Sequence, residues 1–162
     1  MTGGHVLATV LALSLVAAVL TAPAFGQTSG LQQRLAKATS LNCTFPVIAT
    51  GTWESGTPMA KTAAAKLTVT FKNINVDEGT ADTGSALSAS ASSLVVVRYS
   101  NDYLHLMQSQ HDGPLYTTTV IARETKEGRL MAVHTRHEYT QISLPGFTSR
   151  PEMYVGDCTV TP

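Results

Sequence analysis

The sequence predicts an all-β domain, a small antiparallel meander of about seven strands, closed as an up-and-down barrel rather than as a two-sheet sandwich. Gly, Pro, Asn and Asp recur after residue 43, and the segments between them are rich in Thr, Val, Ile and Tyr. No stretch inside this region has the apolar spacing of a long helix. Two cysteines, Cys43 and Cys158, lie near its two ends, and a bridge between them requires the first and last strands to be neighbours.

An apolar run without charged residues covers positions 5–20, and Ala22-Pro23-Ala24 follows it. This arrangement is typical of a secretory signal peptide with an A-x-A cleavage site, so we expect a signal peptide over 1–24 and a secreted or periplasmic protein. The alternative is a retained anchor, because the run approaches the roughly 20 residues of a membrane span. After cleavage no other membrane span is expected.

The even cysteine pair of an exported protein is expected to be oxidised, and two separate buried thiols are the alternative. Before the strands, residues 25–42 form a flexible or short helical lead-in, in which Leu31, Leu35 and Ala38 share one side. Residues 43–160 then form one domain.

The strands follow from two-residue alternation. In the first, 44–54, one face is expected to carry Phe45, Val47, Ala49, Gly51 and Trp53. In the second, 66–76, the apolar positions change parity, which predicts a β-bulge near Lys72-Asn73.

The Gly/Ser/Ala-rich segment 77–93 is expected to be a mobile loop. A tight hairpin around Asn101-Asp102 joins 94–100 to 103–109. A second hairpin, with the turn sequence ETKEG, joins 115–123 to 129–140, and 152–160 is the closing strand.

Two short motifs are similar to those of lipocalin-type barrels: Gly51-Thr52-Trp53 to the opening G-x-W, and Asn101-Asp102-Tyr103 to a T-D-Y motif. The resemblance covers six residues of 162. It implies a cavity for an apolar small molecule, with the Trp packed at the closed end of the barrel.

The formal net charge is zero, with 11 basic and 11 acidic residues scattered along the chain. Nucleic-acid binding requires a basic footprint, so no nucleic-acid partner is expected.

The segment AVHTRHEYTQ, residues 132–141, concentrates the polar side chains. On a strand, His134, Arg136 and Glu138 share one face, while His137 and Tyr139 share the other with Met131 and Val133. The favoured interpretation is a solvent-facing ladder of His134, Arg136 and Glu138. The alternative is a pocket wall in which Arg136 binds an anionic group and, if buried, pairs with Glu138. His137 and Tyr139 are expected on the more apolar face, where His137 would be hydrogen-bonded within or at the rim of the core.

We expect no metal, because the two histidines point to opposite sides and a site would need His105 or His111 with Glu138 or Asp112. We expect no cofactor and assign no catalytic residue, because no serine lies in G-x-S-x-G and the Asp82-Thr83-Gly84 match to aspartic proteases is isolated. The rival hypothesis is a secreted hydrolase with His134 or His137 as base and Glu138 orienting it.

The sequence therefore predicts an exported, barrel-like binding protein. Its ligand would be a small apolar or anionic molecule or an envelope protein, and a structural envelope protein is the other alternative. The loop 144–156 is expected to be a rigid, Pro-braced connection over an open barrel end, and a protein interface is its alternative role. The candidate ligand-binding residues are Trp53, Tyr116, His134, Arg136, His137 and Tyr139.

Overall fold

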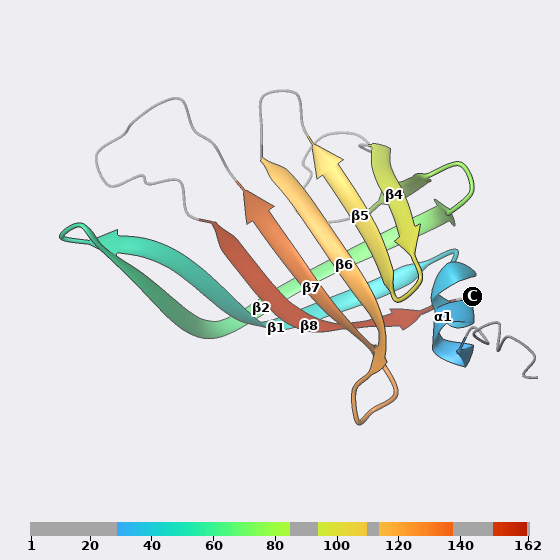
Figure 1. The fold of residues 1–162 in the computed structure, drawn as a ribbon, viewed down its shortest axis with the longest axis horizontal. Helices are drawn as coiled ribbons and strands as arrows, with labels where there is room; N and C mark the ends of the chain where they lie inside the picture. Colours follow the sequence, from blue (N-terminus) through green and yellow to red (C-terminus); the bar gives the residue numbers. More distant parts are fainter. Residues whose placement is uncertain (1–28, 85–93, 110–113, 138–150, 162) are drawn as a thin grey trace, which may run out of the picture.

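The computed structural model describes residues 29–84, 94–109, 114–137 and 151–161 (Figure 1). These residues form one short helix and eight strands. The elements are α1 (Gly30–Ala36), β1 (Leu41–Glu54), β2 (Thr57–Asn75), β3 (Thr80–Thr83), β4 (Leu94–Ser100), β5 (Tyr103–Ser109), β6 (Leu115–Glu124), β7 (Leu130–His137) and β8 (Glu152–Val160).

Each strand pairs antiparallel with the next along the chain, and β8 pairs with β1. The hydrogen-bonded pairings therefore form a closed ring in the order of the sequence. This confirms the all-β meander. The disulfide lies within this closing pair of strands: Cys43 on β1 is directly opposite Cys158 on β8 and is bonded to it.

The strand count is eight rather than seven, because the predicted loop 77–93 contains β3. Gly79, at φ +73°, closes the turn before it, and the Asn75 side chain accepts hydrogen bonds from the backbone N–H groups of Asp77 and Glu78. This turn brings Thr80 back beside β2. Residues 85–93 of the predicted loop lie outside the described residues.

The second strand also begins earlier than predicted, at Thr57 instead of residue 66. Ser55 and Gly56 both have positive φ, at 50° and 82°, and make the tight hairpin turn that lets the chain fold straight back on β1.

The predicted single face of the first strand is wrong. Phe45 is fully buried, whereas Val47 is 42% exposed. The register of β1 shifts between these residues against both β2 and β8. Pro46 lies at the shift, and proline has no N–H to donate to a ladder, so the irregularity falls where the pairing is weakest.

Other local predictions are confirmed. The β2–β3 register shifts between Lys72 and Asn75, and Asn73 has φ 51°, as expected for the predicted bulge. Ser100 pairs with Tyr103 across the Asn101-Asp102 turn, in which Asn101 has φ 45°.

The predicted lead-in is the helix α1, which lies over one end of the sheet (Figure 1). Leu35 is completely buried in the core, and Leu31 packs against it. Gln32 donates to Asp102 in the β4–β5 turn, and Arg34 pairs with Glu124 at the end of β6. The helix thus covers the end of the core where these two hairpin turns lie.

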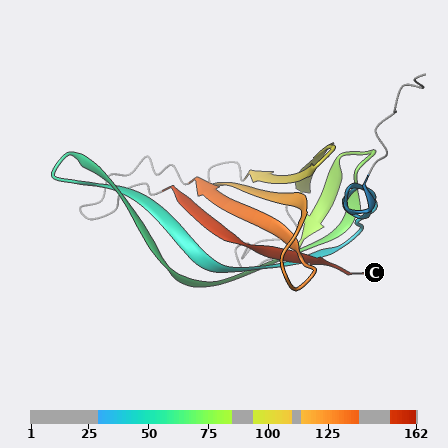
Figure 2. The same ribbon diagram turned by 60° about the horizontal axis from the view of Figure 1, so that its bottom comes forward.

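At the opposite end the β1–β2 hairpin extends beyond the other strands as an arm (Figure 2). Trp53 lies in this arm, paired with Pro58 next to the hairpin turn. The G-x-W segment thus lies at the end of β1 farthest from α1, and the side chain of its Trp is outside what the structure describes.

Candidate functional site

The core-facing side of the sheet changes from apolar to polar with distance from α1. One row of cross-strand neighbours is apolar: Gly156, Ala132, Val120 and Leu104. The next row is Ile48, Tyr154, His134, Thr118 and Leu106. The third is Thr50, Glu152, Arg136, Tyr116 and Gln108. Polar groups thus collect at the end of the core where the arm begins.

His134 is the central member of this cluster. Its side chain is only 2% exposed, and its Nδ1 shares a 2.8 Å hydrogen bond with the Thr118 hydroxyl on β6. The other ring nitrogen, Nε2, is also buried and has no hydrogen-bond partner among the described residues. A buried nitrogen without a partner costs free energy, so native structures rarely keep one without a purpose.

Three aromatic rings surround the His134 imidazole. Phe45 on β1 lies 5.6 Å away between ring centroids, and Tyr116 and Tyr154 each lie 5.9 Å away. The Tyr116 ring is nearly parallel to the imidazole, at 23°. These rings come from three different strands and give His134 flat, mostly apolar walls.

A charged pair borders the rings. Arg136 and Glu152 lie directly opposite each other on β7 and β8, with 3.7 Å between Nη1 and Oε2. The Tyr154 hydroxyl donates to the same carboxylate oxygen at 2.8 Å. The cluster therefore joins a cation, a carboxylate and a phenol on the core-facing side.

These surroundings change the protonation of two groups. Burial, reinforced by the nearby Arg136 charge, lowers the pKa of His134 to about 4, so the imidazole is neutral at pH 7. Burial, followed by the hydrogen bond to Glu152, raises the pKa of Tyr154 to about 12, so its hydroxyl stays protonated and donating.

The favoured prediction of a solvent-facing strip is wrong, because the His134–Arg136 face points into the core. The same face continues back through Ala132 and Leu130, both buried, whereas Met131 on the other face is 40% exposed. Arg136 pairs with Glu152, and its predicted partner Glu138 lies outside the described residues. The predicted core position of His137 is wrong for the same reason: it lies on the outer face.

The predicted ligand-binding residues separate into three groups. Tyr116, His134 and Arg136 are brought together on one face. His137 is not part of this cluster, because it pairs with Leu115 on the opposite face. The backbone of Trp53 lies five positions along β1 from Ile48, the cross-strand neighbour of Tyr154, and its side chain is outside what the structure describes. Tyr139 lies outside the described residues.

Sequence reasoning missed Phe45, Thr118, Glu152 and Tyr154. Alternation along β6 places Thr118 on the same face as Tyr116, so that residue was available from the pattern alone. Glu152 and Tyr154 required the register between β7 and β8, which the intervening loop does not reveal.

The hydroxyl–imidazole contact of the cluster is shielded from solvent. The Thr118–His134 contact joins a hydroxyl to an imidazole, but the hydroxyl belongs to a residue only 1% exposed, and a base with a pKa of about 4 is a poor match for neutral pH. Within the described ranges, no three His, Cys, Asp or Glu side chains are grouped to hold a metal ion.

No helix in the described part of the chain has the length and apolar character to cross a membrane.

No known protein family, curated protein or solved structure matches this chain.

Proposed function

We propose that this protein binds a small molecule at the end of its core where His134, Tyr116, Tyr154 and Arg136 meet. The observation that carries this proposal is the buried Nε2 of His134, which lacks a hydrogen-bond partner among the described residues. A polar group of a ligand would satisfy that nitrogen, as binding sites with few, well-placed polar groups commonly do.

The surroundings of His134 indicate the character of this ligand. Three aromatic rings within 6 Å of the imidazole favour a molecule with a flat, apolar part. The Arg136 charge, which already disfavours protonation of His134, favours a polar end that is anionic or accepts hydrogen bonds. Glu152 balances this charge when no ligand is bound.

We further propose that the protein is exported to a secreted or periplasmic location. The Cys43–Cys158 disulfide supports an oxidising compartment, and the apolar segment before Ala22-Pro23-Ala24 supports cleavage there. Intact-mass measurement of protein from its producing cells is expected to give the mass of a chain that begins at Phe25. The mass of the full chain would contradict cleavage.

Native mass spectrometry of the protein from its producing cells tests the binding proposal. We expect the wild type to carry an additional mass that disappears on denaturation. His134→Phe keeps a ring but removes Nε2, so this variant is expected to lose the additional mass. His137→Phe, on the opposite face of the same strand, is expected to keep it.

Two results would contradict the binding proposal: a wild-type protein that carries no additional mass, or an additional mass retained equally by both histidine variants. If His134→Phe fails to fold, Tyr154→Phe replaces it. That change removes only the hydroxyl that holds the Glu152 carboxylate, and we expect it to weaken retention of the ligand.

A further inference from the structure

The outer face of the sheet carries a continuous surface without formal charge. Two neighbouring rows cross it from β2 to β5, and we name them together the uncharged face. Its members are Ala64, Val47, Val155, Val133, Thr119 and His105 in one row, and Thr62, Ala49, Met153, Thr135, Thr117 and Met107 in the other.

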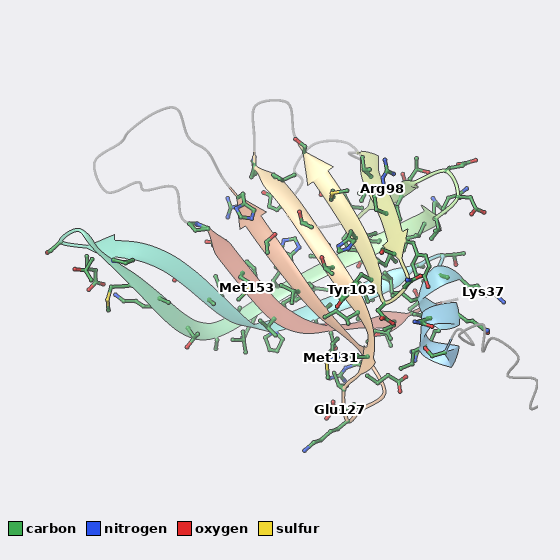
Figure 3. The ribbon with its side chains drawn as sticks, in the orientation of Figure 1. Lys37, Arg98, Tyr103, Glu127, Met131 and Met153 are labelled. Carbon is green, nitrogen blue, oxygen red and sulfur yellow. A yellow bond between two sulfur atoms is a disulfide. The ribbon has the colours of Figure 1, made fainter. Side chains whose placement is uncertain are left out.

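Large apolar side chains on this face are open to solvent. Val47, Met153 and Val155 are 42–44% exposed, although they lie side by side on β1 and β8. Met131 on β7 and Tyr103 on β5 are similarly exposed nearer α1, where Met131 pairs with the charged Asp157 (Figure 3). Isolated exposed apolar residues are ordinary, but a contiguous group of them marks a contact surface.

We propose that the uncharged face is the site at which two copies of this chain associate. In a two-fold symmetric contact, each patch meets an identical patch, so a charged surface would place like charges together. Within the two rows the one ionisable side chain is His105, which shares a hydrogen bond with Thr119. The nearest charge along its row is Arg98 on β4, which pairs with His105 and forms the edge of the face. The chain as a whole has zero formal net charge, so no long-range repulsion opposes the approach of a second copy.

The side chains also suit the packing of one sheet face on another. Val and Thr are β-branched and interdigitate at the spacing of stacked sheets, while the flexible thioethers of Met107 and Met153 fill irregular gaps. An anionic membrane surface fits less well, because lipid headgroups are bound by Lys and Arg and the two rows contain neither.

The test is the mass of the protein in solution, measured by light scattering during size exclusion on protein from its producing cells. At a protein concentration of about 100 μM, we expect the native wild type to have twice the mass of the single denatured chain. Val155→Asp buries two carboxylates in the proposed contact and is expected to give the single-chain mass. Thr159→Asp adds the same charge on the same strand and the same outer face, four positions away. This variant is expected to keep the two-chain mass.

Three results would overturn the proposal. They are a wild type of single-chain mass, a Val155→Asp variant that keeps the double mass, and a Thr159→Asp variant that loses it as readily. If circular dichroism shows Val155→Asp to be unfolded, Met153→Asp makes the same change one pairing away on a side chain that is 44% exposed. The contact involves the opposite side of the sheet from His134, so this test does not depend on ligand binding.

Discussion

A single residue, His134, connects the packing of this protein with its proposed function. Its imidazole is buried among three rings and kept neutral by burial and by the Arg136 charge. A histidine in the unfolded chain titrates near its ordinary pKa of about 6.5, whereas the folded pKa of His134 is about 4. Between these two pH values the unfolded chain therefore binds a proton that the folded chain does not.

The stability of the protein should therefore fall on acidification below pH 6.5. With a folded pKa of about 4, the unfolded chain binds the proton that the folded chain resists, and the loss continues until the pH reaches that value. Between pH 7 and pH 5 this residue alone should cost about 2 kcal/mol of unfolding free energy. Urea unfolding at both pH values measures the change.

His134→Gln should remove this part of the pH dependence, whereas His137→Gln should retain it. Because carboxylates also titrate as the pH falls, the difference between wild type and variant is the informative quantity. Equal pH dependence in wild type and His134→Gln would show that the imidazole is not held neutral by the fold.

Among the elements, the contact between β1 and β8 determines where the site lies. At Gly156 the backbone of β1 comes so close that an added Cβ would clash with the Thr44 carbonyl oxygen and would lie 2.7 Å from the Phe45 Cα. This close approach coincides with the register shift that buries Phe45 against His134. The glycine and the register shift thus position the Phe45 ring beside His134.

Gly156→Ala should destabilise the protein by at least about 2 kcal/mol, because the clash is with backbone and cannot be relieved by a rotamer change. Gly51→Ala is the matched control, since a Cβ there would meet Pro151 Cγ at an ordinary 3.7 Å. Thermal unfolding of the two variants compares them. Similar melting temperatures would mean that the β1–β8 contact is looser than the structure indicates.

The helix α1 also belongs to the core rather than to a loose lead-in. Leu35 is fully buried, so Leu35→Ala should cost about 2–5 kcal/mol of unfolding free energy. Gln33→Ala, on the exposed side of the same helix, should change the stability by less than about 0.5 kcal/mol. Denaturant unfolding of both variants decides whether the helix unfolds with the sheet; equal small effects would mean that it does not.

At the scale of the whole molecule, the closed order of strands was predictable and the site was only partly so. Two cysteines at the ends of a strand-rich region require the ends to meet, and the alternation of apolar residues locates most strands. Alternation alone does not say which face is inward, and for β7 the short apolar set of Met131 and Val133 indicated the wrong one. The Glu152 partner of Arg136 depends on a register set by the fold as a whole.

The disulfide provides the test at this scale. Cys43 and Cys158 are 115 residues apart, so the bridge restricts nearly all of the strand-forming part of the unfolded chain while joining strands that already pair in the folded one. On the chain-entropy model, the double variant Cys43→Ala/Cys158→Ala should lose about 4–5 kcal/mol of unfolding free energy yet keep its sheet. Urea unfolding measures the loss, and circular dichroism reports whether the strands remain. A variant that loses its strands altogether would show that backbone pairing between β1 and β8 cannot close the ring without sulfur.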